Sequence, residues 1–384
     1  MHPSMLTEEQ IALKDAARKL ALGEFRDRAA RWDREGIYPE ENHHRLAALG
    51  YLGMTIPEEF GGGGASLVDC YLVIEELAKV DFNTALIVHD QNVSPRIIAT
   101  CGSEALKQAF LPRFAAGEIE CAISWTEPEA GSDATAVTTS LRQDGNDYVL
   151  NGGKIFTTFG DRADYLLVYA RFCDSKGARG IGTVLVERES PGVTVNILEQ
   201  KMGARGCNEC EIHFDDVRVP SENIVTEGLA DNSSGFVRPL GVYNATRVGM
   251  GILALGVAEG AFDLARDYMK TRRQFGKALS EMQGLQWMMS DMKVQIEAAR
   301  SLCYTALSLI DRGQPDPTLS SIAKVQATEM AQRVTHDAMQ MFGGYGYFGS
   351  LPLERMVRDV RMLTITGGTT QIHKNGIARS LFTD

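Results

Sequence analysis

Several features that mark particular classes of protein are missing from this chain of 384 residues. No run of about 18 consecutive apolar residues occurs, so we expect no membrane-spanning helix. The net charge is −11 and there is no basic stripe, which argues against binding to nucleic acid. The N-terminal segment 1–5 lacks the apolar core of a secretory signal, so we expect a cytoplasmic protein.

The seven cysteines are too few and too scattered to predict a disulfide framework, and they indicate reduced thiols. Cys207 and Cys210 have the CxxC spacing of redox and zinc sites, but only His213 lies nearby as a further ligand. Residues 210–220 alternate between apolar and polar side chains, as strands do. We therefore favour a strand edge with two small residues over a metal or redox site.

The residue pattern changes twice along the chain, without a low-complexity linker or an internal repeat. Residues 6 to about 120 predict helices, and Thr7 with Gln10 fits a capping box at the first of them. The further helical stretches are 40–50, 66–80, 83–100 and 104–116. From 121 to 225, turn residues separate short β-rich runs, which favours a small antiparallel sandwich or barrel. These runs are 147–150, 165–172, 182–187, 193–198 and 210–220.

Helical periodicity returns after residue 235. Apolar side chains from Leu285 to Cys303 follow the i, i+3, i+4, i+7 pattern over about five turns, which fits a helix of a four-helix bundle. The sequence thus predicts an α+β fold in three parts: an N-terminal helical domain (1–120), a middle β domain (121–230) and a C-terminal helical bundle (231–384).

Four motifs stand in the same order as these parts. Residues 121–133 read Cys-Ala-Ile-Ser-Trp-Thr-Glu-Pro-Glu-Ala-Gly-Ser-Asp, a proline- and glycine-containing loop whose amides can face an anion. The other three are 151–158, 270–277 followed by Gln283, and 340–346 paired with 368–371. Together they resemble the acyl-CoA dehydrogenase family. The resemblance implies that family's fold, a bound FAD and a CoA thioester as the substrate.

The resemblance also implies roles for single residues at the flavin ring. Ile123 and Trp125 would contact the flavin through their backbones, and Thr126 would bond the pyrimidine side of the ring. Ser132 would meet the flavin phosphates or the thioester. On the next strand, Phe156 would stack behind the ring, and Thr158 would bond near flavin N5.

The adenosine half of FAD would be shared between subunits. Arg272 would reach the pyrophosphate across a subunit interface, which suits a bidentate guanidinium, with Phe275 and Gln283 lining the adenosine arm. The remaining residues implied for this half of the cofactor are Gln340, Gly343, Gly344, Thr369 and Gln371. A shared cofactor implies an oligomer, and we expect a homotetramer built as a dimer of dimers.

The usual catalytic base of the family is missing. The family signature reads Ile-Tyr-Glu-Gly-Thr, whereas residues 365–369 read Ile-Thr-Gly-Gly-Thr, so that Gly367 stands in place of the glutamate. The backbone N–H that polarises the thioester is kept, but the base at Cα is lost. Some members carry the glutamate before an arginine on another helix, and that position is Thr246, before Arg247. Asn244 and Arg247 match positions that contact the substrate.

Asp90 is the candidate replacement. It lies in 86–93, which matches the helix that forms the far wall of the acyl pocket. There a carboxylate could abstract a proton from a carbon other than Cα, as in the cyclohexene-carboxyl-CoA dehydrogenases that the chain resembles. Gly367 would then leave room for a ring. The alternative is a solvated or capping aspartate, and we interpret His89 as a structural residue.

Two other functions remain open. The run 283–292 also resembles 3-sulfinopropionyl-CoA desulfinases, which are non-redox C–S lyases, but such an enzyme should carry an arginine at the sulfinate and Arg96 is the nearest. A catalytically inactive, acyl-CoA-binding flavoprotein is the third possibility. A redox-active enzyme would need an electron acceptor such as an electron-transferring flavoprotein.

Overall fold

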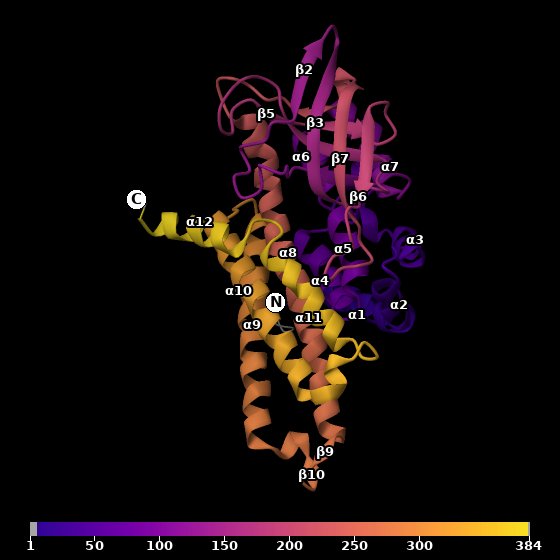
Figure 1. Cartoon of the computed structure of the whole chain (residues 1–384), viewed down its shortest axis with the longest axis vertical. Coiled ribbons are helices and arrows are strands. Elements are labelled where there is room, and N and C mark those ends of the chain that lie inside the picture. The colour runs from indigo at the N-terminus through magenta and orange to yellow at the C-terminus, as the bar shows by residue number, and fades with distance from the viewer. Residues whose placement is uncertain (1–5, 383–384) are drawn as a thin grey trace.

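The computed structural model describes residues 6–382; the segment 1–5, on which the secretory-signal argument depends, lies outside this range. Figure 1 shows a sheet at one end of the long axis, long helices that run to the other end, and shorter N-terminal helices beside them. The predicted order of helices, strands and helices is confirmed, and so is the α+β class.

The N-terminal part contains seven α-helices. The capping box at the first is confirmed, because the Thr7 side chain accepts from Gln10 N and the Gln10 side chain accepts from Thr7 N. The predicted stretch 83–100 is two helices, since Pro95, in the first turn of the second one, has no N–H to continue the preceding helix. The helices are α1 (Glu8–Leu20), α2 (Arg26–Glu35), α3 (Glu40–Ala48), α4 (Leu67–Ala78), α5 (Phe82–Gln91), α6 (Ser94–Cys101) and α7 (Glu104–Ala115).

The middle part is one eight-stranded mixed sheet with the order β6-β7-β3-β2-β4-β5-β8, and β1 pairs with β4. The expectation of purely antiparallel pairing is wrong at two places, because β1 and β2 both pair in parallel with β4. The long loop that follows β1 allows this crossover. The strands are β1 (Cys121–Ser124), β2 (Ser140–Asp144), β3 (Asp147–Thr158), β4 (Tyr165–Arg171), β5 (Ile181–Glu187), β6 (Val193–Ile197), β7 (Glu209–Val219) and β8 (Ile224–Thr226).

The C-terminal part is built around one long apolar helix, α8. By length and composition α8 could cross a membrane, contrary to the reading of the sequence, but 83% of its most apolar window is buried inside the protein. A helix that is apolar on all sides is a core helix when protein surrounds it. The helices are α8 (Ser234–Thr271), α9 (Gln283–Asp311), α10 (Pro317–Met341), α11 (Leu353–Arg361) and α12 (Thr370–Phe382), with a β9–β10 hairpin (Arg273–Gln274 and Lys277–Ala278) after α8.

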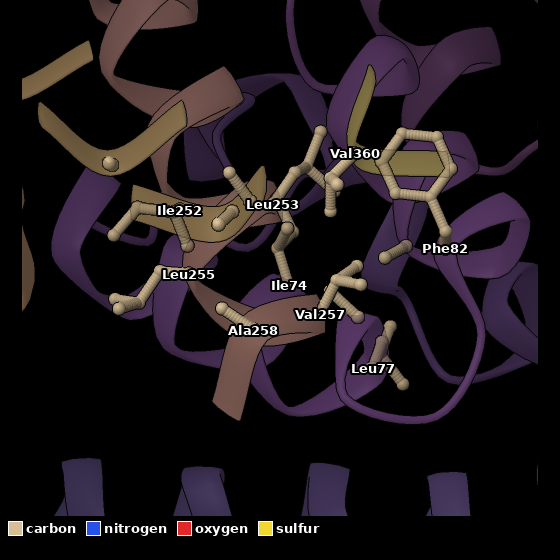
Figure 2. Packing of buried hydrophobic residues seen from close by; sticks show 14 of the residues in the cluster. Ile74, Leu77, Phe82, Ile252, Leu253, Leu255, Val257, Ala258 and Val360 are labelled. Carbon is tan, nitrogen blue, oxygen red and sulfur yellow. The ribbon is translucent and has the colours of Figure 1, made fainter. Parts of the chain in front are cut away.

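Figure 2 shows how α8 joins the parts of the chain. Side chains such as Leu253 and Val257 of α8 pack with Ile74 of α4 and Val360 of α11 in one continuous core. Figure 1 shows α8 running from the sheet to the β9–β10 hairpin. The same helix therefore sets the spacing between the N-terminal helices and the rest of the bundle.

Two glycines of α8 allow its close approach to the end of α4. A Cβ at Gly260 would lie 2.2 Å from the backbone oxygen of Lys79, and one at Gly256 would lie 2.6 Å from Ala78 Cβ. Both distances are shorter than real contacts, and the obstructing Lys79 atom is backbone, which cannot rotate away.

We predict that Gly260→Ala destabilises the fold by about 1–3 kcal/mol, the usual effect of overpacking a core. Gly241→Ala is the control on the same helix, because a Cβ there meets nothing within 4 Å, and it should stabilise by up to about 1 kcal/mol through helix propensity. Urea unfolding of both variants measures the difference. Equal effects at the two positions would contradict the close approach of α8 and α4.

Candidate active site

A buried ion pair holds the loop between β1 and β2 against β3. The Nζ atom of Lys154 lies 2.7 Å from Oε1 of Glu127 and also donates to the backbone oxygen of Trp125 at 3.0 Å. The Glu127 carboxylate accepts three further bonds, from the backbone N–H groups of Thr138 at 2.7 Å and Thr139 at 3.0 Å and from the Thr138 hydroxyl at 2.8 Å. The loop therefore has a fixed path beside the strand.

The charge of Lys154 controls the protonation of Glu127. Burial raises the pKa of the Glu127 carboxyl, but the Lys154 ammonium overcomes this effect and holds the pKa at about 2. Because the folded-state pKa lies below the usual value of 4.5, the contribution to stability is present above pH 4.5 and is lost as the pH falls towards 2. The Lys154 side chain is fully buried, so loss of either charge leaves the other uncompensated.

Phe156 near the end of β3 is both strained and exposed. Its φ is +57°, in the left-handed region that bulky residues avoid, and it is 62% exposed. The pairing of β3 with β7 shifts register between Lys154 and Thr157, on either side of it. Strained residues of this kind collect at functional sites. An exposed ring held in this way offers a stacking surface, which fits the flavin that the resemblance implies.

The loop beside Phe156 supplies further groups that fit a flavin. Trp125 stacks on Tyr169 with ring centroids 4.3 Å apart and donates its indole N–H to Ala134 O at 3.2 Å. The backbone oxygen of Thr126 accepts from Ile155 N at 2.8 Å. Among residues 6–382 the Thr126 hydroxyl has no partner, so it is free to bond a ligand.

Three more residues predicted to contact the flavin ring differ from one another in burial and hydrogen bonding. Ile123 lies half-buried in β1, and Ser132 is exposed on the following loop. Thr158 ends β3 and donates its hydroxyl to Oε2 of Glu209 on β7 at 2.9 Å. Thr158 is therefore not a free hydroxyl, unlike Thr126.

The residues predicted for the adenosine half lie at the far end of the long helices. A pocket of about 890 Å³ there is lined by residues that include Arg272, Gln340, Gly343 and Gly344. The Arg272 guanidinium faces the Tyr345 ring at 5.8 Å and makes no ion pair within the described part of the chain. A Cβ at either glycine would meet nothing within 4 Å. Open space beside an unpaired guanidinium fits a pyrophosphate.

The two halves of the expected cofactor site are not brought together within one chain. Phe275 lies in the β9–β10 turn with 94% exposure, and Gln283 begins α9 beyond it. Figure 1 places this hairpin at the opposite end of the long axis from β3. Thr369 and Gln371 lie elsewhere again, at the start of α12, where Thr369 Oγ1 accepts from Ile372 N at 3.2 Å.

The turn at Gly367 and Gly368 presents two backbone donors. The φ angles of the two glycines are +65° and +95°, which glycine adopts without steric cost. Lys324 Nζ donates to Gly368 O at 2.7 Å, and His373 Nε2 donates to Gly367 O at 3.1 Å. The N–H groups of both glycines have no acceptor within the described range. Such a pair can polarise a thioester carbonyl.

There is room for a side chain at position 367, but the backbone conformation there disfavours any residue other than glycine. A Cβ on Gly367 would meet only Met250, at 3.5 Å. Because φ is left-handed, any residue other than glycine costs about 1–2 kcal/mol there.

One face of α8 lies beside this turn. Tyr243, Arg247 and Met250 follow one another at i, i+4 and i+7, so they share that face. A Cβ on Gly367 would lie 3.5 Å from Met250 Cγ, and burial raises the pKa of the Tyr243 hydroxyl to about 12, with the charge of Asp90 adding to the rise. Helix α5, which carries Asp90, packs against α8 as well.

Neighbouring residues of α8 place the predicted substrate contacts. Arg247 donates to Oδ1 of Asn244 at 2.7 Å, and its buried Nε atom has no partner among the described residues. Thr246, at the alternative position for a glutamate, is buried and lines a small cavity of about 10 Å³. Neither the usual position of the family base, at Gly367, nor the alternative position, at Thr246, therefore carries a carboxylate.

Asp90 lies in the last turn of α5 with 23% of its side chain exposed. Within residues 6–382 its carboxylate accepts no hydrogen bond, so nothing supports a capping role; the nearest ring nitrogen, Nε2 of His89, is 3.9 Å away. Burial raises the pKa of Asp90 to about 8; the charge of Glu209 adds to this rise and that of Lys201 opposes it. A general base with a pKa near the working pH is well suited to proton abstraction.

The other side of α5 is packed. Nδ1 of His89 lies 3.3 Å from the Tyr71 hydroxyl, and burial lowers the pKa of His89 to about 3, so the ring is neutral. This supports its interpretation as a structural histidine. Arg96 lines the same small cavity as His89 and Tyr71, whereas Asp90 does not. The arginine expected of a desulfinase therefore does not lie beside Asp90.

The CxxC pair has no redox or metal geometry. Cys210 lies in β7, Cys207 precedes it, and both are buried free thiols. Burial raises the pKa of Cys210 to about 12, which leaves no thiolate at neutral pH. Residues 6–382 contain no group of three or more His, Cys, Asp and Glu side chains that could hold a metal ion.

Sequence reasoning missed several charged residues that position the site. Glu127 and Lys154 lie inside motifs that had been recognised, but nothing in the sequence says that they pair with each other. Lys324 and His373, which hold the glycine turn, and Glu209, which bonds Thr158, come from separate elements. Their importance depends on burial, which the sequence does not show for these residues.

Comparison with known proteins gives consistent matches over nearly the whole chain. Residues 7–118 match the acyl-CoA dehydrogenase N-terminal domain, 122–217 the middle domain and 233–382 the C-terminal domain. The chain is similar to 3-sulfinopropanoyl-CoA desulfinase from Paraburkholderia xenovorans, with 42% identity over 98% of this chain and 96% of that one. It is also similar to cyclohex-1-ene-1-carbonyl-CoA dehydrogenase from Syntrophus aciditrophicus, with 39% identity over 98% and 90%.

A solved structure agrees with these matches. Glutaryl-CoA dehydrogenase from Mycobacterium smegmatis, in complex with FADH2, superposes with a TM-score of 0.92 and 26% identity, covering 99% of this chain and 96% of that one. The shared fold and the groups around Phe156 agree on a flavin site, and FAD is the cofactor.

We predict that Lys154→Met destabilises the protein by about 3–5 kcal/mol, because it leaves Glu127 as an uncompensated buried charge. FAD content should fall with it, since the loop that carries Trp125 and Thr126 loses its anchor. Urea unfolding and flavin absorbance measure the two effects. The double variant Lys154→Met/Glu127→Gln should recover most of the stability; a double variant as unstable as the single one would show that the pair does not act through charge.

Proposed function

The chain belongs to the acyl-CoA dehydrogenase family and is an FAD-dependent oxidoreductase of CoA thioesters, and we propose that Asp90 replaces the usual glutamate as its base. We further propose that the acyl group is cyclic or unsaturated. The observation that carries this proposal is the contrast between position 367, which has no side chain, and Asp90, whose carboxylate is partly exposed and accepts no hydrogen bond.

In the proposed reaction, each of the residues around α8 has a role. The free N–H groups of Gly367 and Gly368 polarise the thioester carbonyl, while Arg247 and Asn244 hold the substrate arm. Asp90 removes a proton from a ring carbon and becomes a carboxylic acid. A bound FAD would supply the acceptor for the hydride from the second carbon, so that loss of a proton and a hydride leaves one new double bond and charge is balanced. Gly367 leaves space beside the thioester for a ring, where a glutamate would stand.

A non-redox C–S lyase is the alternative, since a desulfinase is 42% identical to this chain. The position of Arg96 behind α5 weighs against it, because no guanidinium on that wall is placed beside Asp90 to meet a sulfinate. A catalytically inactive acyl-CoA-binding flavoprotein would bind thioesters without turnover. Activity assays on cyclohex-1-ene-1-carbonyl-CoA and on 3-sulfinopropanoyl-CoA separate all three functions.

We predict that Asp90→Asn lowers the rate of flavin reduction by cyclohex-1-ene-1-carbonyl-CoA by about 10²–10⁴, the usual loss on removing a positioned base. FAD content should be unchanged, because Asp90 contacts no residue assigned to the cofactor. Asp174→Asn, whose side chain is 91% exposed, is the control for loss of one charge. Unchanged turnover in Asp90→Asn would reject Asp90 as the base. Sulfite release from 3-sulfinopropanoyl-CoA without flavin bleaching would favour the lyase.

The proposal extends to the assembly. Because Phe156 and Arg272 lie at opposite ends of one chain, a complete FAD site needs a second subunit. A dimer already supplies it, and we propose the homotetramer that the family resemblance implies. We also propose a cytoplasmic location and an electron-transferring flavoprotein as the electron acceptor.

Mixed subunits test the shared site. Phe156→Asp and Arg272→Glu should each lose FAD when expressed alone. The two variants, differently tagged, would be co-expressed and co-purified as hetero-assemblies. Each pair of unlike subunits then contains one site with both halves intact. FAD content, measured by flavin absorbance, should therefore recover to about half of the wild-type value. No recovery, or full FAD content in either single variant, would contradict a site shared in this way.

A further inference from the structure

The ring of His373 joins the turn at Gly367 and Gly368 to helix α10. Its Nε2 atom lies 3.1 Å from Gly367 O, and its Nδ1 atom lies 3.1 Å from the Ser321 hydroxyl oxygen. A Cβ on Gly368 would lie 3.0 Å from Nε2, so the ring packs directly against the turn. His373 is 2% exposed and Ser321 is 8% exposed, so little water can compete for these bonds.

The bonding partners fix which ring nitrogen carries the hydrogen. Burial lowers the pKa of His373 to about 4, with the charges of Lys324 and Arg247 adding to the fall, so the ring is neutral and has a single N–H. A carbonyl oxygen can only accept, and therefore Nε2 carries the hydrogen and donates it to Gly367 O. Nδ1 is then the acceptor, and the Ser321 hydroxyl donates to it. The hydrogen bonds thus run in one direction, from Ser321 through the ring to the turn.

The last of these bonds ends on a peptide group of the proposed site. The carbonyl of Gly367 and the N–H of Gly368 belong to the same planar peptide group. A hydrogen bond accepted by the oxygen draws electron density from the nitrogen, and hydrogen bonds in series polarise one another. The Gly368 N–H, which has no acceptor within residues 6–382, is therefore a stronger donor than an ordinary amide. It is one of the two donors assigned above to the thioester carbonyl.

Two glycines in succession make a turn that needs support from other elements. Neither residue has a Cβ that would restrict rotation of the peptide groups, and both have positive φ. A rotated peptide between Gly367 and Gly368 would present its carbonyl oxygen, and not its N–H, to the substrate. His373 holds the first carbonyl in place. Lys324, which is fully buried on α10, holds the second, with Nζ 2.7 Å from Gly368 O.

We propose that His373 is a positioning residue for the reaction: it locks the peptide between Gly367 and Gly368 and strengthens the N–H that polarises the thioester carbonyl. Ser321 fixes the tautomer that this role requires. The inference rests on the proposed role of the turn and does not depend on Asp90. The hydrogen on Nε2 stays in place throughout, since the bonds orient and polarise the turn without any proton transfer along them.

Two substitutions of similar size separate this role from simple packing. In His373→Gln the side-chain amide nitrogen can take the place of Nε2 and donate to Gly367 O. In His373→Asn the amide reaches only the place of Nδ1, so the bond to the turn is lost. His373→Leu lacks both polar groups. His44→Gln, on α3 with its side chain 73% exposed, is the control for loss of a histidine.

The carbonyl stretch of bound acetyl-CoA, labelled with carbon-13 in its thioester carbonyl, measures the polarisation by infrared difference spectroscopy of the FAD-loaded protein. Acetyl-CoA has no β-carbon to give up a hydride, so the flavin stays oxidised whichever residue is the base. The wild type, His373→Gln and His44→Gln should shift the stretch to lower wavenumber. His373→Asn and His373→Leu should lose most of that shift and still bind acetyl-CoA, because Asn244 and Arg247, which hold the substrate arm, are unchanged.

The rate of flavin reduction should follow the spectra. With saturating cyclohex-1-ene-1-carbonyl-CoA, His373→Asn and His373→Leu should reduce the flavin about 10–100-fold more slowly than the wild type, a smaller loss than the about 10²–10³ expected on removing an oxyanion donor itself. His373→Gln should stay close to the wild-type rate. FAD content and urea unfolding check that each variant is folded.

Equal shifts of the stretch in His373→Gln and His373→Asn, whether kept or lost, would overturn the inference, because the ring would then act only by filling space. A wild-type shift that survives in His373→Leu would do the same. A wild type that binds acetyl-CoA without any shift would reject the turn itself as the polarising element, and the role of His373 with it. Turnover in Asp90→Asn decides the base separately, since Asp90 has no part in the infrared measurement.

Discussion

The arrangement of the whole molecule depends on the burial of α8. Its middle part, residues 248–258, is buried on all sides, and its glycines let the end of α4 approach closely. Because α8 touches the N-terminal helices on one side and the C-terminal turns on the other, it sets the distance between them. Helix α5, which carries Asp90, and the segment before the glycine turn at 367 both pack against it, so the packing that stabilises the fold also positions the parts of the site.

Electrostatics then decide which groups react. Two other carboxylates are compensated: Lys154 balances Glu127, and Lys201 and Thr158 stabilise Glu209. The Asp90 carboxylate accepts no hydrogen bond within the described residues, and burial raises its pKa to about 8. Perturbed groups of this kind are concentrated at catalytic sites, since a carboxylate that is easily protonated is a better base. The absence of a hydrogen bond to Asp90 within the described residues is what the proposed role of Asp90 as the base requires.

Much of the fold could be predicted because it depends on local patterns. Three examples are the capping box at Thr7, the periodicity from Leu285 and the alternation in β7. Each pattern depends on residues that lie close together in the sequence. Pro95 also marks the break between α5 and α6 in the sequence, because proline cannot donate the backbone hydrogen bond that would continue a helix. The parallel pairing of β1 with β4 was not readable, because register between distant strands is set by tertiary packing.

The candidate site was predictable only in part, for the same reason. Motifs predict the residues of the flavin site, and the missing glutamate at Gly367 is visible as a departure from one of them. The support given to the glycine turn by Lys324 and His373, and the link between Glu209 and Thr158, join residues far apart in the chain. No spacing rule connects such pairs, and their energetic importance comes from burial that only the structure shows.

Exchange of substrate hydrogens with solvent tests the central claim most directly, namely that the base acts from Asp90 and not at Cα. The holoenzyme would be incubated in D2O with butyryl-CoA or with cyclohex-1-ene-1-carbonyl-CoA, and deuterium located by NMR. The account predicts deuterium in the ring of the cyclic thioester, lost in Asp90→Asn, and none at Cα of butyryl-CoA above the uncatalysed rate. Enzymatic incorporation at Cα of butyryl-CoA would contradict it.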